Sequence, residues 1–176
     1  MLFRSITAAD GSVTVHAGGA IDATSVVSST DADANDISLT TTSGDITVNT
    51  INAGAVGDVS LSAAAAINDD SSAGTVITAD VLTATAVGAM TLDTTVNSID
   101  LTTSAAGNID VDETNAVTLT NITAADGSIT VDAGGAITVT SVVSSTDADA
   151  NDVSLTTTSG DITISNITAE IGRAHV

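Results

Sequence analysis

The feature that most constrains this chain is a series of short alternating runs, each opened by Gly or Asn. Examples are "GSVTV" at 11–15, "NDISL" at 35–39, "GDITV" at 44–48 and "GDVSL" at 57–61, and the series continues to "GDITI" at 160–164. The third and fifth positions of each run are apolar and the fourth is polar. Alternation of period two predicts β-strands, and the leading Gly or Asn predicts turns between them.

The spacing of these runs predicts how the strands are arranged. Alternate runs begin roughly 18–24 residues apart, for example at 11, 35 and 57 and again at 107, 127 and 151. A repeat of about 20 residues is typical of a solenoid, in which each coil stacks on the one before it. We therefore predict an all-β fold, a parallel β-helix or β-solenoid of about eight uncapped coils. Helices are not expected, because Thr, Val and Ile disfavour them.

The composition of the core supports this fold over its main competitor. The chain is 43% hydrophobic but has one aromatic residue, Phe3, so Ala, Val, Ile and Leu must fill the interior. A string of β-sandwich domains of about 116 residues would also give short strands with regular turns. Such sandwiches usually place aromatic rings in their cores. The missing aromatics therefore favour a narrow solenoid core.

The sequence also contains a longer repeat, which spans several of the short runs. The block 6–49 recurs at 122–165, offset by 116 residues, with 37 of 44 positions identical. The match ends where the segments 1–5 ("MLFRS") and 170–176 ("EIGRAHV") begin. These segments can be back-translated into an inverted pair, GTGCTCTTCCGATCT and AGATCGGAAGAGCAC, which resembles a sequencing adapter. We interpret both as scars to be excluded from the fold. We expect residues 6–169 to form one solenoid segment of a longer protein.

The charge of the chain excludes two classes of partner. Asp and Glu number 22 and Lys and Arg number 2, so the formal net charge is −20. Nucleic acids are bound through cationic contacts to phosphates, and Arg4 and Arg173, the two basic residues, lie in the excluded segments, so we expect no nucleic-acid partner. Anionic membrane surfaces are disfavoured for the same reason, and no membrane insertion is expected in this segment. Cations and polycationic surfaces remain as partners.

The most specific candidate site is an acidic loop that occurs twice. Oxygen ligands at alternating positions suit Ca²⁺, which takes six to eight of them. The pattern resembles the start of an EF-hand loop but departs from it at Asp36, where Gly is required, and at Thr42, where Glu is required. Two interpretations stay open: a loose Ca²⁺ site, which would make stability rise with Ca²⁺, or a solvated turn. The candidate ligands are Asp31, Asp33, Asn35 and Asp36, and their copies Asp147, Asp149, Asn151 and Asp152.

Two stretches resemble a known family. "GSITVDAGGAITV" at 127–139 and "LTTTSGDITI" at 155–164 are similar to the repeats of filamentous-haemagglutinin-type adhesins and related giant bacterial surface proteins. This resemblance implies a right-handed β-helical stalk that is secreted and displayed at the bacterial cell surface. Receptor or glycan binding would then belong to other parts of the full protein. We expect a structural segment rather than an enzyme, whose open ends self-associate.

Two other functions remain as alternatives. A polysaccharide-acting β-helix enzyme of the pectinase type needs two carboxylates about 5–10 Å apart in a groove. An ice-binding solenoid needs regular outward rows of Thr, for which the candidates are residues 40–42, 83–85, 118–120 and 138–140. Irregular coil lengths argue against a lattice-matched face, and Thr is also a good strand residue on any half-exposed surface.

Overall fold

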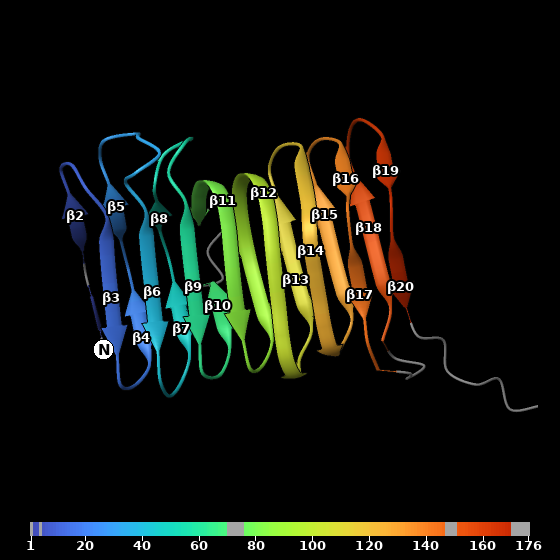
Figure 1. Cartoon of the computed structure of the whole chain (residues 1–176), viewed down its shortest axis with the longest axis horizontal. Helices are drawn as coiled ribbons and strands as arrows, with labels where there is room; N and C mark the ends of the chain where they lie inside the picture. The colour runs from blue at the N-terminus through green and yellow to red at the C-terminus, as the bar shows by residue number, and fades with distance from the viewer. Residues whose placement is uncertain (1, 4, 70–75, 147–150, 170–176) are drawn as a thin grey trace, which may run out of the picture.

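The chain folds as a parallel β-solenoid of about seven turns, with about 21 residues per turn (Figure 1). The structure is a computed structural model that describes residues 2–3, 5–69, 76–146 and 151–169. Every regular element in these ranges is a strand, and the strands of successive coils pair in parallel. The all-β solenoid predicted from the sequence is therefore confirmed. The coils number about seven rather than eight because several are longer than 20 residues.

The strands are short near both ends and long in the middle of the chain. In order they are β1 (Leu2–Phe3), β2 (Ile6–Ala8), β3 (Val13–Ala17), β4 (Ile21–Ala23), β5 (Val26–Ser28), β6 (Ile37–Thr41), β7 (Ile46–Val48), β8 (Ile51–Asn52), β9 (Val59–Ala63), β10 (Ile67–Asp69), β11 (Ile77–Ala86), β12 (Met90–Ala106), β13 (Ile109–Glu113), β14 (Val117–Asp126), β15 (Ile129–Ala133), β16 (Ile137–Val139), β17 (Val142–Ser144), β18 (Val153–Thr157), β19 (Ile162–Ile164) and β20 (Ile167–Ala169).

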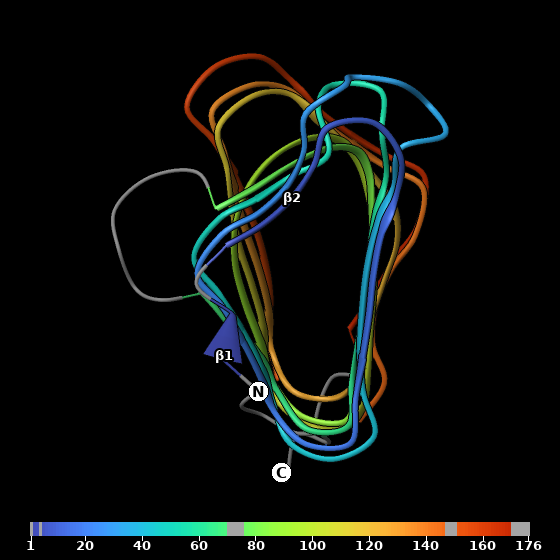
Figure 2. The same cartoon turned by 90° about the vertical axis from the view of Figure 1, so that its left-hand side faces the viewer.

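Two long faces run the length of the solenoid. Face A is the column of paired strands β3, β6, β9, the second half of β11, the 98–103 part of β12, β14, and then β16 with β17 and β19 with β20. Face B is the column β1, β4, β7, β10, the start of β12, β13, β15 and β18. Seen along the axis, the coils superpose into one elongated cross-section (Figure 2).

A third, shorter column exists only in the first part of the chain. Face C consists of β2, β5, β8, residues 77–79 of β11 and residues 94–96 of β12. It ends where Thr94 pairs with Glu113, because a turn at 114–116 then leads the chain directly to face A. On face A, Ile99 pairs with Leu119 and Asp100 with Asn121, so Thr120 is an extra residue, a β-bulge. The bulge is followed by coils in which two short strands replace one long strand on face A.

These changes place the two copies of the long repeat on opposite faces. The first copy starts with β3 on face A, but its counterpart β15 lies on face B. Along face A, five turns lead from Val13 to Leu119 and a sixth turn leads to Val139. Ile129, the counterpart of Val13 in the second copy, lies halfway through that sixth turn. Identical sequence thus forms the same strand–turn–strand unit at two angular positions, five and a half turns apart.

The core is a thin stack of aliphatic side chains between these faces. Strand residues alternate between buried and outward positions, as in Ile37, Leu39 and Thr41 of β6. Ile, Leu and Val side chains of successive coils lie over one another, and Met90 is buried among them. No buried side-chain nitrogen or oxygen in the described residues lacks a hydrogen-bond partner. Because no aromatic ring is needed, the core matches the composition from which it was predicted.

Candidate functional site

The first acidic loop is held to neighbouring coils by its own polar side chains. Asn35 is buried, and its Nδ2 donates to Asp10 Oδ1 at 3.1 Å and to the Thr30 carbonyl at 3.2 Å. Asp31 Oδ1 accepts from the Val56 amide at 2.9 Å. These are the hydrogen bonds of a turn that joins coils, as in the second interpretation of the loop.

Asp36 continues this network. Its amide donates to Ser12 Oγ at 3.2 Å, and its Oδ1 accepts from the amide of Asp58 at 3.1 Å. Asp33 is exposed. In the described part of the chain no three His, Cys, Asp or Glu side chains lie close enough to hold a metal ion together. Calcium binding at this loop therefore stays a prediction, with water or carbonyls required as further ligands.

The second acidic loop repeats the same contacts where it can be compared. Asn151 Nδ2 donates to Asp126 Oδ1 at 2.9 Å, and the Asp152 amide donates to Ser128 Oγ at 3.1 Å. Asp147 and Asp149, two candidate ligands, lie outside the described residues. The network is thus built into the repeated block itself. It does not depend on the face on which the block lies.

The two loops connect different pairs of faces. The first, at 29–36, connects face C to face A, whereas residues 145 and 146 leave face A and residues 151 and 152 enter face B. The first loop lies at the upper edge in Figure 1, and β17 and β18 approach the second from the lower edge.

A rule that the sequence analysis missed explains many of the acids. The residue just before a strand, usually Asp or Asn, accepts a hydrogen bond from the amide of the equivalent residue one coil later. Asp45 Oδ1 accepts from Ala66 at 2.9 Å, Asp58 Oδ1 from Val81 at 3.2 Å, and Asn108 Oδ1 from Ser128 at 3.0 Å. The sequence signal was the second letter of "NDISL", "GDITV" and "GDVSL". These carboxylates satisfy main-chain N–H groups at the corners of the coils.

Stacking acids in this way has an electrostatic cost. Burial raises the pKa of Asp58, and the charges of Asp36, Asp80 and Asp33 raise it further, against a hydrogen bond from Val81 that lowers it. Like charges on successive coils disfavour the ionised form. No Lys or Arg lies in the described residues to offset them. Cations from solution are therefore the available counter-charge.

Face B carries the densest row of outward acids. Asp93, Asp112 and Asp132 pair across three adjacent coils. Burial raises the pKa of Asp110 on the same face, and the charges of Asp112, Asp132 and Asp69 add to the effect. Asp22, another outward acid, lies in the second coil of this face. We call the outward carboxylates Asp22, Asp93, Asp110, Asp112 and Asp132 the acidic face.

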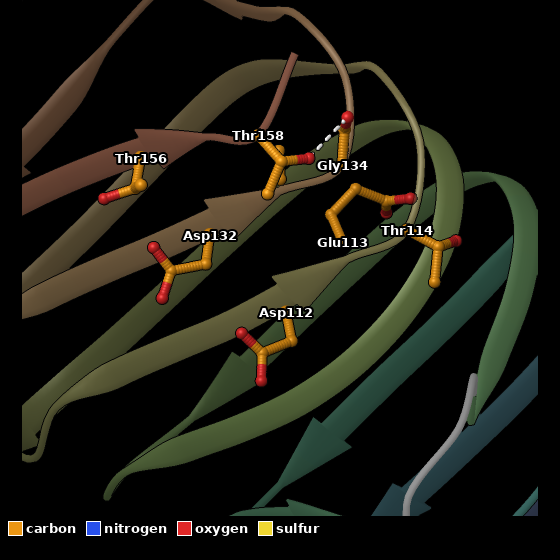
Figure 3. Close-up of a pocket in the computed structure, with 8 residues that line it drawn as sticks. Asp112, Glu113, Thr114, Asp132, Gly134, Thr156 and Thr158 are labelled. Carbon is orange, nitrogen blue, oxygen red and sulfur yellow. Dashed lines mark hydrogen bonds between the residues drawn. The ribbon is translucent and has the colours of Figure 1, made fainter.

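A shallow hollow of about 460 Å³ lies beside this row (Figure 3). Its lining includes Asp112, Asp132 and Thr156, and the Thr158 hydroxyl donates to the Gly134 carbonyl at 2.9 Å on its rim. Asp112 and Asp132 point the same way from neighbouring strands (Figure 3), so they are the candidate carboxylate pair for the enzymatic alternative. Both are exposed to solvent, so their environments do not separate them into an acid and a nucleophile.

Glu113 also lines the hollow, but its carboxylate points away from Asp112 and Asp132 (Figure 3). It is 3% exposed and accepts from Thr94 Oγ1 at 2.7 Å and from the amides of Val96 and Asn115, each at 3.1 Å. Burial raises its pKa, although these hydrogen bonds lower it in part. Val96 lies in the last strand segment of face C, so no further described strand of that face accepts a hydrogen bond from its amide. The Glu113 carboxylate accepts that hydrogen bond instead. Its role is structural.

Face A differs from face B in its outward chemistry. Ser38, Ser60 and Thr83 pair in one row, and a second row runs parallel to it through five coils. That second row consists of Thr40, Ser62, Thr85, Thr102 and Thr123. We call these eight residues the hydroxyl face. Of the Thr rows expected from the sequence, Thr40, Thr83 and Thr85 belong to it, whereas Thr41 is buried.

Comparisons with known proteins give no relative for this chain. No family model, no curated protein and no solved structure matches it. Within the described residues, no helix is long and apolar enough to cross a membrane.

Proposed function

We propose that this chain is a stalk segment of a large secreted protein displayed at a bacterial cell surface, of the filamentous-haemagglutinin type. The observation that carries the proposal is continuous parallel pairing: each described coil pairs in parallel with the next, and the register shifts within a pair only between β12 and β14. Such a solenoid lengthens by adding coils without changing its cross-section. It is suited to hold a binding tip away from a surface.

The last coil of the solenoid supports the same proposal. In the last coil, Ile162, Ile164 and Ile167 are all partly exposed, whereas their counterparts Ile46, Val48 and Ile51 in the first copy are buried by a following coil. Among the described residues, no strand pairs with the outer edges of β18, β19 and β20. Open β-edges of this kind pair with further strands. We therefore infer that this segment associates end to end when it is isolated.

The experiment is to lengthen the solenoid by one repeat. A chain in which residues 6–121 occur twice in tandem should gain five and a half turns, or about 26 Å at ~4.8 Å per turn. Small-angle X-ray scattering should show this increase in maximum dimension with an unchanged cross-sectional radius of gyration. An increase in the cross-section, or a flexible two-bead profile, would contradict the stalk. The control is a chain of the same length in which the sequence of the added copy of residues 6–121 is scrambled, so that mass is added without further coils.

A second candidate is suggested by the hollow on face B. If Asp112 and Asp132 acted on a polysaccharide, soluble neutral or acidic polysaccharides would be cleaved by the chain and spared by the Asp112→Asn variant. Reducing-end release is the measurement. The stalk proposal predicts no cleavage by either protein, because the two carboxylates share one exposed environment and the described residues include no Trp, Tyr, Lys or Arg to hold a sugar.

A further inference from the structure

The hydroxyl face keeps its rows straight although the coils differ in length. From Ser60 to Thr83 the chain runs 23 residues, but from Thr85 to Thr102 it runs only 17, and both pairs are in register. The differences are absorbed at the edges of the coils, by loops such as 29–36 and 54–58. Irregular coil length therefore does not argue against a regular Thr and Ser lattice on face A.

The geometry of this lattice follows from the strands. Neighbouring hydroxyls along the solenoid axis are one strand spacing apart, ~4.8 Å, and neighbours along a strand are two residues apart, ~6.7 Å. The hydroxyls lie close enough to interact directly, since Thr85 Oγ1 donates to Ser62 Oγ at 3.2 Å. Each hydroxyl both donates and accepts hydrogen bonds. The face thus offers two adjacent rows of hydrogen-bond partners over three coils, and the second row continues alone for two more coils because Thr83 pairs next with Asp100.

The charge distribution indicates what kind of partner fits this face. The acidic face on the other side holds five carboxylates. Among the outward residues of face A between Thr14 and Thr123 the one carboxylate is Asp100, which accepts from Asn121 Nδ2 at 3.0 Å. A cation or a basic protein would be attracted to face B instead. A neutral sugar chain would usually require aromatic side chains, which face A lacks.

We propose that the hydroxyl face binds crystalline water, so that this solenoid adsorbs to ice. Ice is a neutral lattice in which every molecule donates and accepts hydrogen bonds. A periodic row of hydroxyls, five of the eight on Thr beside a methyl group, can hold bridging waters at equally periodic positions. The acidic face stays in solution and keeps the rest of the solenoid hydrated. This activity does not depend on the proposed stalk function, and a test of one does not decide the other.

The experiment measures the inhibition of ice growth by the purified chain. The unaltered protein should slow ice recrystallisation and partition into a slowly growing ice front. The double variant Ser62→Tyr/Thr85→Tyr, which places two rings in the centre of the face, should lose at least tenfold in activity per mole. The matched control is Thr91→Tyr/Thr130→Tyr, which makes the same change at outward positions of face B and should keep full activity.

Three outcomes would overturn the proposal. The first is an unaltered protein that does not affect ice, and the second is a control that loses activity as much as the double variant. The third is a dimer in gel filtration that only Ser62→Tyr/Thr85→Tyr dissociates, since the face would then be an interface between copies of this chain. If the double variant does not fold, as judged by circular dichroism, Thr83→Val removes one hydroxyl with little change in shape and should reduce the activity several-fold.

Discussion

At the scale of single residues, several acids of this chain act as main-chain acceptors as well as charges. Asp36, Asp45 and Asp58 each accept from an amide of the following coil. An aspartate needs only its oxygen for this, so an asparagine could serve as well, as Asn108 does. The acidity of the chain is therefore separable from the hydrogen bonds that its acids make.

This distinction predicts different effects for two substitutions at one position. Asp36→Ala removes the acceptor for the Asp58 amide and should lower the free energy of unfolding by about 1 kcal/mol. Asp36→Asn keeps an acceptor and removes a charge that raises the pKa of Asp58, so it should leave stability equal or higher. Thermal melts at neutral pH and low salt compare the two. Equal destabilisation by both variants would show that the charge of Asp36, rather than its hydrogen bond, is what matters.

Glu113 predicts a dependence of stability on pH. Its pKa is raised in the folded chain above the ordinary value of 4.5, so folding favours the protonated form. The stabilising contribution is complete below 4.5 and is lost as the pH rises through the folded pKa. The melting temperature should therefore rise on acidification from neutral pH toward 4.5, and Glu113→Gln should make this rise smaller.

The control for Glu113 is Asp161→Asn, which also removes one negative charge but at an exposed position. Melting curves from pH 4.5 to pH 7 should keep the slope of the unaltered protein in this control. The same slope in both variants would mean that the general charge of the chain, and not buried Glu113, sets the pH dependence.

At the scale of elements, the strand–turn–strand unit is encoded locally, whereas its angular position is not. The two blocks of the long repeat form the same strands on opposite faces, because alternation and turn residues specify the unit. The face is decided by the coils between them, through the bulge at Thr120 and the end of face C at Glu113. Neither feature has a strong sequence signal. The half-turn offset was therefore not predictable from the repeat alone.

The candidate site was also predictable only in its local features. The acidic loops were found from their repetition, and their turn-like hydrogen bonds follow from the known preferences of Asp and Asn. The contacts to Asp10 and Val56 depend on which coils stack, which the sequence does not state. Thr40, Thr83 and Thr85 of the hydroxyl face were among the candidates, but the register of its rows could not be predicted, since loops of unequal length hide it.

The Gly-Gly turns of the two blocks give a prediction at this scale. In the identical motif "AGGAI", a Cβ at Gly18 would meet nothing within 4 Å, whereas a Cβ at Gly134 would clash with the Thr114 carbonyl of the preceding coil. Gly134→Ala should therefore cost about 1–3 kcal/mol through backbone overpacking. Gly18→Ala is the matched control and should cost less than 0.5 kcal/mol. Urea denaturation of both variants is the measurement, and equal costs would contradict the stacking of 134 on 114.

At the scale of the whole molecule, the charge of the chain predicts a response to cations. With a formal net charge of −20 and like charges repeated on successive coils, screening or bound ions must reduce the repulsion. We expect the melting temperature to rise between chelator and millimolar Ca²⁺. Sodium chloride at matched ionic strength separates screening from binding. Identical melts in chelator and in Ca²⁺ would remove the calcium prediction for Asp31, Asp33, Asn35 and Asp36.

The central claim is that successive coils run in the same direction and stack in register, and introduced disulfides test it most directly. The chain has no Cys, so pairs can be placed freely. Parallel stacking places Ser38 beside Ser60 and Thr40 beside Ser62, at a spacing that a disulfide can bridge. Mild oxidation should therefore link the double-Cys variants 38/60 and 40/62 but not 38/62 and 40/60. Efficient linkage of 38/62 and 40/60 instead would show antiparallel neighbours and contradict the solenoid.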